Sequence, residues 1–277
     1  MIQDVFGLPV NLAAPFDFSF LGRYGRPFCV FDGQTSGNIS FGMQSEQYGK
    51  LLVKFAGAQT INSRYAPEKA VQMLRNAAPL YDILRHPALV RLAGHGEVAG
   101  GYAVIFRWAE GNNLYNRKTK ERLRHQPLIA RLQMLDRVFD FHLHCAQKGF
   151  VSVDFYDGNL LCDFLTGGIT VCDIDLYRPS PAVNDVGRMP GSARFLSPEE
   201  YDLGAPIDSL TMQYTMGALA FDFLSRDGSR YEDQWTADPL LFEIAARAVH
   251  PDRAQRYAGM GAFLAAWRSA IRQSTLY

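Results

Sequence analysis

The stretch VSVDFYDGNLL at residues 151–161, followed by ITVCDIDLYR at residues 169–178, decides the fold of this chain. Asp154 precedes Asn159 by five positions, and Asp173 follows after one short hairpin. A carboxylate at the first position can orient and deprotonate an attacking hydroxyl, and Mg²⁺ prefers a few protein oxygens together with phosphate and water. The spacing therefore indicates a magnesium–nucleotide site for phosphoryl transfer, with Asp154 as base and Asn159 and Asp173 as metal ligands.

The Asp-x-x-x-x-Asn spacing alone is also common in loops where the two residues only cap turns, so the neighbouring segments matter. Residues 125–150 carry apolar side chains at helical spacing, which predicts a buried helix ended by Gly149. After the loop, two short apolar runs at residues 160–164 and 168–174 flank a Thr-Gly-Gly turn, which predicts a hairpin. Helix, loop, hairpin and carboxylate follow one another in the order that phosphoryl transfer needs.

Together with further segments, these elements resemble the protein-kinase superfamily, and more narrowly bacterial protein-kinase-like proteins with a DFYDGN-type catalytic loop and a GRMxGSxRFxSPEE segment. The resemblance spans about residues 22–277. It includes GKLLVKFAGA at residues 49–58, similar to the third kinase strand, and GSARFLSPEE at residues 191–200, similar to the end of an activation segment. The ordered set is far more specific than any one of its members.

The resemblance implies that Lys54 pairs with the α and β phosphates of ATP, whereas an isolated strand lysine is more often a solvated edge charge. The Gly-rich hairpin at residues 31–42 precedes it, and its glycines permit close approach of backbone amides to phosphate. These glycines are Gly33, Gly37 and Gly42. Two glycine positions of the usual G-x-G-x-x-G pattern hold other residues, so this motif by itself is weak.

GYAVIFRWAEGNNL at residues 101–114 resembles the fifth kinase strand and the hinge that follows it. The resemblance places Phe106 near the gatekeeper position beside the adenine. Arg107 to Ala109 would then supply hinge backbone to the nucleotide.

The glutamate expected to pair with Lys54 has two candidate positions. Glu68 lies fourteen residues after Lys54, near the start of an amphipathic helix that we expect to run to about Leu84. Alignment backwards from HPALVRL at residues 86–92 instead places Ala77 there, which would leave the lysine without this partner. We favour Glu68, although a glutamate in a first helical turn can also serve only the helix dipole.

Ser197-Pro198-Glu199 matches the A-P-E motif, and Arg256 falls where the family's arginine pairs with that glutamate. We expect a bidentate, buried ion pair that pins the peptide-docking segment to the helical lobe. The same Ser-Pro-Glu sequence is also a good helix start, and both interpretations can hold.

The chain departs from the kinase pattern at several positions. Ser152 and Val153 replace His-Arg before the catalytic Asp, and Tyr156 stands where many kinases carry a lysine. Ile174-Asp175 replaces Phe-Gly, and Met212 replaces an Asp that normally braces the loop. Without the arginine, a phosphate on the activation segment has no partner at that position, so we expect activity without loop phosphorylation.

Composition fits this picture. A chain of 277 residues, 48% of them hydrophobic, can bury a large core. The formal net charge is zero and basic runs are absent, which argues against nucleic acid as the main partner. The absence of long apolar runs argues against a membrane span, and we expect a cytoplasmic protein with reduced cysteines.

We therefore predict an α+β, bilobal protein-kinase-like fold. Residues 1–21 form an N-terminal extension, residues 22–109 a nucleotide-binding lobe with a small antiparallel sheet and one helix, and residues 110–277 a mainly helical lobe. The predicted function is transfer of phosphate from ATP with Mg²⁺ to a hydroxyl, favouring a bacterial serine/threonine protein kinase.

Two alternatives stay open: a small-molecule kinase of the aminoglycoside or choline type, and a nucleotide-binding pseudokinase. The altered loop before Asp154 favours the first alternative, and the degraded glycine loop favours the second. The acceptor, protein or small molecule, and the oligomeric state are not determined by the sequence.

Overall fold

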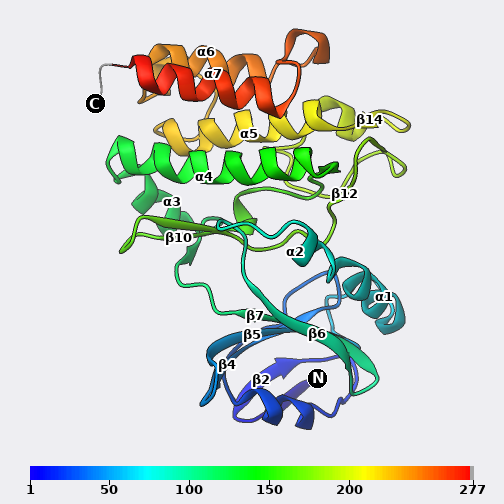
Figure 1. The fold of residues 1–277 in the computed structure, drawn as a ribbon. Helices are drawn as coiled ribbons and strands as arrows, with labels where there is room; N and C mark the ends of the chain where they lie inside the picture. Colours follow the sequence, from blue (N-terminus) through cyan, green and yellow to red (C-terminus); the bar gives the residue numbers. More distant parts are fainter. Residues whose placement is uncertain (275–277) are drawn as a thin grey trace. The chain divides into compact units, whose positions relative to one another are not determined.

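The computed structural model describes residues 1–274, which form two compact units of mixed α and β structure with small antiparallel sheets (Figure 1). The first, here called the sheet unit, comprises residues 1–85 and 90–109. The second, the helical unit, comprises residues 86–89 and the chain from residue 110 onward.

The sheet unit is built on a five-stranded antiparallel sheet with strand order β3-β4-β5-β7-β6. Neighbouring strands along the chain are joined by short turns, except that helices α1 and α2 lie between β5 and β6. The strands are β3 (Arg26–Phe31), β4 (Ile39–Ser45), β5 (Gly49–Ala56), β6 (Leu92–Val98) and β7 (Gly101–Arg107). The predicted strand around Lys54 is confirmed as β5.

The predicted helix from residue 67 to about 84 is interrupted in the structure. Helix α1 (Pro67–Ala77) ends just before Pro79, and the four-residue α2 (Leu80–Ile83) begins after it. Proline has no N–H to donate to the carbonyl four residues earlier, so the hydrogen bonding of the first helix cannot continue through it. The expectation of one continuous helix is therefore wrong.

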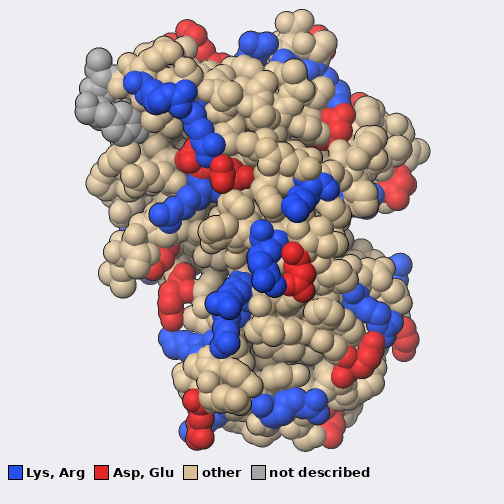
Figure 2. Space-filling view, viewed as in Figure 1, with Lys and Arg blue, Asp and Glu red and all other residues tan. Residues whose placement is uncertain are grey.

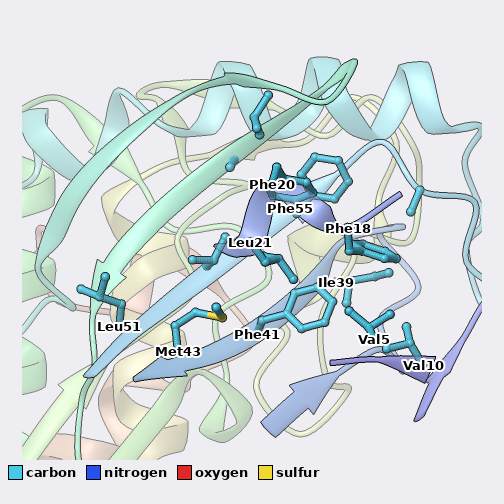
Figure 3. Close-up of a cluster of buried hydrophobic side chains, with 14 of the residues drawn as sticks. Val5, Val10, Phe18, Phe20, Leu21, Ile39, Phe41, Met43, Leu51 and Phe55 are labelled. Carbon is cyan, nitrogen blue, oxygen red and sulfur yellow. The ribbon is translucent and has the colours of Figure 1, made fainter. Parts of the chain in front are cut away.

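The first 21 residues pack into the sheet unit. Strands β1 (Ile2–Val5) and β2 (Leu8–Asn11) form a hairpin, followed by the short 3-10 helix η1 (Ser19–Tyr24). Figure 3 shows their apolar side chains among those of β4 and β5. The Phe18 and Phe41 rings meet edge to face at 5.3 Å, and Phe20 lies 4.8 Å from Phe55. This segment, predicted as an extension, thus contributes part of the unit's core.

Five helices form most of the helical unit. Figure 1 shows α4, α5 and the α6–α7 pair in successive layers, and these neighbours contact one another. The central helix, α5, is apolar around nearly its whole circumference, so it is buried on all sides. The helices are α3 (Arg117–Arg124), α4 (Leu128–Gln147), α5 (Ser209–Leu224), α6 (Pro239–Ala248) and α7 (Met260–Gln273).

Short strands and 3-10 turns connect these helices. The predicted hairpin is confirmed: β10 (Leu160–Asp163) pairs antiparallel with β11 (Gly168–Val171), and β8 (Asn112–Asn113) adds a third strand. The other short elements are β9 (Phe150–Val151), η2 (Asp157–Asn159), β12 (Arg178–Pro179), β13 (Ala182–Val183), η3 (Pro198–Tyr201), β14 (Pro206–Ile207), η4 (Glu232–Gln234) and η5 (Arg253–Gln255). Residues 178–192, which lead into the segment similar to the end of an activation segment, thus contain two short strands. Strand β12 pairs with β9, and β13 pairs with β14.

All four cysteines carry free thiols. Within residues 1–274, no helix is long and apolar enough to cross a membrane. Basic and acidic side chains are interspersed on the face shown in Figure 2, as the balanced composition leads us to expect.

Candidate functional site

The predicted catalytic loop follows the C-terminus of α4. This helix ends at Gln147, and Gly149 takes a left-handed conformation with φ +76° that turns the chain into β9. Asp154 also lies in the left-handed region, with φ +61°. Residues other than glycine adopt this conformation at an energetic cost, and such residues cluster at functional sites. The strain falls on the residue that the sequence nominates as the base.

His142 of α4 packs against this loop, a contact that the sequence pattern did not predict. Its ring lies 4.3 Å from the ring of Phe155, the residue after Asp154. Nδ1 is 2.8 Å from the carbonyl oxygen of Val138, and Nε2 is 2.9 Å from the Tyr177 hydroxyl. Because a carbonyl only accepts, Nδ1 carries the proton and Nε2 accepts from Tyr177.

Burial keeps this histidine neutral. The side chain of His142 is fully buried, and this lowers its pKa to about 4. Burial also raises the pKa of Tyr177 well above its usual value, so the phenol stays protonated and can donate. The pair therefore links the catalytic loop to the chain after Asp173 without carrying charge.

The two predicted metal ligands meet at one end of the β10–β11 hairpin. Leu160 pairs with Val171, and just beyond this pair the amide of Cys172 donates to the carbonyl oxygen of Asn159 at 2.8 Å. Asn159 and Asp173 thus lie at the same end of one ladder. The hairpin supplies the reason that two residues fourteen positions apart come together.

The pKa of Tyr156 is raised by burial and by the negative charges around this end of the hairpin. Burial is the main cause that raises the pKa of its phenol, and the negative charges of Asp154, Asp173 and Asp157 raise it further. A side chain at Gly158 would overlap the Tyr156 ring, so glycine is needed where the ring crosses the turn. The structure therefore brings Asp154 and Asp173, both predicted from the sequence, into the surroundings of one phenol.

The donor set fits a small hard cation such as Mg²⁺. Asn159 Oδ1 accepts from the amide of Tyr156 at 2.8 Å, and Asp173 Oδ1 accepts from the amide of Asp175 at 3.3 Å. Amide and carboxylate oxygens are the donor atoms that Mg²⁺ prefers. Among residues 1–274, no group of three or more His, Cys, Asp or Glu could hold a metal, so phosphate and water oxygens would have to complete the coordination.

A second group of charges, which the sequence did not predict, joins the loop to three other elements. The group consists of Lys120 of α3, Asp157 of η2, Asp222 of α5 and Arg194, which lies between β13 and η3. We call these four residues the loop cluster. Arg194 contacts Asp157 at 2.6 Å and Asp222 at 3.1 Å, and Lys120 contacts both carboxylates. Both carboxylates are buried. Each of these charges is unremarkable in the sequence, and the four come from distant segments.

The predicted Glu199–Arg256 pair is confirmed. Arg256 Nη1 lies 2.7 Å from Glu199 Oε1, and Nη2 lies 2.9 Å from Oε2, so the pair is bidentate and buried. Arg253, which the sequence did not nominate, contacts Glu199 Oε1 at 2.6 Å and Asp208 at 2.7 Å. Burial opposes the charge of Glu199, but its hydrogen bond to Arg256 and the nearby arginine charges outweigh burial, and its pKa is lowered. We call these four residues the anchor cluster.

The helix-start interpretation of the same motif also holds. Glu200 Oε2 accepts from the amide of Ser197 at 2.7 Å and from its hydroxyl at 2.9 Å, at the start of η3. Glu200 is nearly as buried as Glu199 and makes no ion pair in the described chain. Burial raises its pKa to about 7. The pKa values of two adjacent glutamates thus shift in opposite directions, because arginines outweigh burial at Glu199 whereas burial dominates at Glu200.

In the sheet unit, Lys54 lies in the middle of β5, opposite Ser40 of β4 and Val104 of β7. In the Gly-rich loop, Gly33 has open space around it, whereas a side chain at Gly37 would come within 2.7 Å of Ser63 Oγ. Gly37 also has φ +84°. Glycine at position 37 therefore has a packing reason of its own, and phosphate contact at either glycine stays a prediction.

Phe106 is buried in β7, and its ring meets that of Tyr81 at 4.7 Å. Arg107, the next residue, donates to the carbonyl of Tyr48 at 2.8 Å. Ala109 follows the end of β7. The adenine and hinge roles assigned to this stretch stay predictions.

Glu68 is exposed in the first turn of α1, and Ala77, the alternative position, is buried at the last residue of the same helix. Which of the two corresponds to the lysine partner therefore stays a prediction. Two of the departures from the kinase pattern are buried apolar positions: Val153 is 2% exposed and Met212 is fully buried in α5. Neither position presents a charge to the loop.

Comparison with known proteins gives a distant similarity. No family model matches the chain. The serine/threonine-protein kinase pkn2 of Myxococcus xanthus is 25% identical over 196 residues, which cover 68% of this chain and 23% of that protein. The chain thus spans about a quarter of the length of this relative. The similarity relates the chain distantly to a serine/threonine kinase.

Proposed function

We propose that this chain is an ATP-dependent phosphotransferase with a bilobal protein-kinase-like fold, and that it is a serine/threonine protein kinase of bacterial type. The anchor cluster carries this proposal. A buried, bidentate Glu199–Arg256 pair fixes the segment that protein kinases use to dock a peptide, as the resemblance predicts.

The fold supports the proposal. The sheet unit has a Gly-rich hairpin, a lysine strand and a helix in the order expected of a nucleotide-binding lobe, which we assign to residues 22–109. The helical unit has the helix, loop and hairpin expected of a catalytic lobe, which we assign to residues 110–277. The distant similarity to a serine/threonine kinase points the same way.

In this proposal Asp154 orients the acceptor hydroxyl and takes its proton as the phosphoryl group leaves ATP. Asn159 and Asp173 would hold Mg²⁺, which neutralises charge on the phosphates. Lys54 would contact the α and β phosphates. The neutral His142–Tyr177 pair keeps the loop in place without adding a positive charge that would compete with the metal for carboxylate oxygens.

The position of Gly191 favours a protein acceptor over a small molecule. A Cβ atom built on Gly191 would lie 3.8 Å from the Cα atom of Asp154, so the segment that ends at Glu199 passes directly beside the proposed base. A peptide lying along this segment would present its hydroxyl to Asp154. A compact amino alcohol or aminoglycoside would not need such a platform.

The experiment is incubation of the dephosphorylated protein with labelled ATP and Mg²⁺, with generic protein acceptors and a panel of amino alcohols and aminoglycosides. We expect phosphate on serine or threonine of the protein itself or of a protein acceptor. Asp154→Asn should abolish transfer but keep ATP affinity, because the base acts on the acceptor. Asp163→Asn, in the hairpin turn where the carboxylate only binds Thr166 and Leu165, is the matched control.

Each alternative has its own outcome. Phosphate found only on a small molecule would favour the small-molecule kinase. Nucleotide binding that needs Mg²⁺ but gives no transfer to any acceptor would favour the pseudokinase. Near-normal turnover of Asp154→Asn would remove the assignment of the base.

A further inference from the structure

The loop cluster links residues 187–197, which we call the acceptor segment, to the predicted catalytic loop through charged side chains. Arg194 Nη2 lies 2.6 Å from Asp157 Oδ2, and Nη1 lies 3.1 Å from Asp222 Oδ1. Lys120 Nζ contacts the same Asp157 oxygen and lies 3.0 and 3.1 Å from the two oxygens of Asp222. Two carboxylates and two cations from four separate elements therefore share one network.

Burial makes the network obligatory for the loop. The side chain of Asp157 is completely buried, that of Asp222 is 6% exposed and that of Lys120 is 14% exposed. A buried carboxylate is costly unless cations compensate it. Asp157 Oδ1 has no hydrogen-bond partner among the described residues, so the compensation reaches this side chain through Oδ2. The turn that carries Asn159 is thus tied to Lys120 and Arg194.

Arg194 is the member that belongs to the acceptor segment. It stands three residues after Gly191, which passes beside Asp154, and five before Glu199. Its own backbone is held as well, because Arg230 Nη2 donates to the Arg194 carbonyl at 3.2 Å and Arg230 Nη1 donates to the Tyr214 hydroxyl at 2.9 Å. The contact from Arg194 to Asp157 therefore fixes the segment where it crosses the catalytic loop.

This arrangement does with a carboxylate what a phosphate does where the residue before the catalytic Asp is an arginine. Here that residue is Val153, which is buried and apolar. The ordering contact is reversed: the segment supplies the cation, Arg194, and the loop supplies the anion, Asp157. A charged contact built from side chains is present as soon as the chain folds.

We propose that Arg194 is a positioning residue that holds the acceptor segment, residues 187–197, on the catalytic loop without phosphorylation. The inference rests on the proposed function. It assigns acceptor binding, and not nucleotide binding, to the Arg194–Asp157 contact. The carboxylates that Arg194 contacts are those of Asp157 and Asp222, so it acts through Asp157 and the segment.

The test compares Arg194→Ala, Arg194→Lys and a matched control, Arg75→Ala. Arg75 of α1 lies outside the acceptor segment, its side chain is 41% exposed, and its guanidinium lies 2.6 Å from Glu97 Oε1. Two readouts are needed: steady-state kinetics with a protein acceptor, and amide hydrogen exchange of residues 187–197 in the full-length protein.

For Arg194→Ala we expect the KM for the acceptor to rise by up to about fivefold, because an ion pair whose arginine is half exposed contributes little free energy. The KM for ATP should change less than about twofold, because the nucleotide ligands are untouched. Exchange in residues 187–197 should accelerate while α7 stays protected. Arg194→Lys should recover part of both effects, and Arg75→Ala should show neither.

Phosphatase treatment is the second arm. Exchange and acceptor KM of the wild-type protein should be the same before and after dephosphorylation. A segment that loosens on dephosphorylation alone, or an Arg194→Ala protein with unchanged exchange and acceptor KM, would overturn the proposal. If Arg194→Ala does not fold, Arg194→Gln provides the same two measurements.

The exchange measurement separates this inference from the proposed function. If the wild-type protein phosphorylates no acceptor, the proposed function fails, and exchange still decides whether Arg194 orders the segment. If the protein is active and Arg194→Ala leaves both readouts unchanged, the positioning role fails and the kinase assignment stands.

Discussion

The anchor cluster and the loop cluster hold the same stretch of chain in different ways. At the anchor, the Arg256 side chain is completely buried and that of Glu199 is 5% exposed. In the loop cluster the carboxylates are equally buried, but the Arg194 side chain is 46% exposed. Water can replace Arg194 and cannot easily replace Arg256. The end of the segment at Glu199 is therefore fixed by folding, whereas the contact between Arg194 and Asp157 can be lost without unfolding.

The largest expected effect lies at the anchor. Glu199→Ala leaves Arg256 buried without its carboxylate, and breaking a buried pair in this way costs roughly 3–5 kcal/mol. Chemical denaturation followed by circular dichroism measures the loss in unfolding free energy.

Glu200→Gln is the matched control for this experiment, because it keeps an oxygen that can accept from Ser197 and removes no ion pair. It should cost far less than Glu199→Ala at neutral pH. Alanine at position 200 would be a poorer control, since Glu200 is itself buried and hydrogen-bonded. Equal losses for Glu199→Ala and Glu200→Gln would mean that the ion pair adds nothing beyond the helix start.

The second effect is a pH dependence that belongs to Glu200 alone. Its pKa is about 7 in the folded protein against a usual 4.5, so between these values the native state binds more protons than the unfolded state. The contribution of Glu200 to stability is therefore full below pH 4.5 and is lost as the pH rises to 7. A shift of this size corresponds to about 3 kcal/mol.

The measurement is the difference in unfolding free energy between wild type and Glu200→Gln across this pH range. His142, whose pKa is about 4 in the folded state, has the opposite slope below pH 6.5, but it is common to both proteins and cancels in the difference. We expect the wild type to lose stability relative to the variant as pH rises. A constant difference would mean that Glu200 is charged in the folded protein throughout.

The third effect tests the catalytic end. If Asp173 and Asn159 hold Mg²⁺, ATP with Mg²⁺ at 100 times its Kd should stabilise the protein by about 2.7 kcal/mol, and the same ATP concentration with EDTA should stabilise it less. Asp173→Ala should erase the difference between Mg²⁺ and EDTA. Asp163→Ala, at the far end of the same hairpin, should retain it. A full Mg²⁺ effect in folded Asp173→Ala would move the metal to other residues.

Local patterns predicted much of the helical unit. The helix over residues 128–147 and the β10–β11 hairpin follow from apolar spacing and a Thr-Gly-Gly turn, and both are confirmed. The Glu199–Arg256 pair followed from the resemblance because both partners sit in recognisable motifs. The C-terminal end of α1 differs from the prediction, because the apolar spacing continues past Pro79 although the helix does not.

The long-range charge contacts of the loop cluster could not be predicted. The loop cluster joins residues from four elements, and a lysine, an arginine or an aspartate in isolation has no sequence signature for its partner. The core role of residues 1–21 was also missed, because short apolar runs broken by Asp4, Asn11 and Asp17 gave no helical or strand period. Tertiary packing, and not local preference, decides both.

The smallest effect completes the comparison between the clusters. Arg194→Ala removes one cation, but Lys120 still contacts both Asp157 and Asp222, and water can reach the vacated position because Arg194 is half exposed. Ion pairs with an exposed partner contribute roughly 0–1 kcal/mol, so we expect the unfolding free energy to fall by less than about 1 kcal/mol. Chemical denaturation beside Glu199→Ala measures this directly. A loss of the same size in both variants would show that Arg194 belongs to the folded core of the unit, and the distinction between a fixed end and an adjustable crossing would fail.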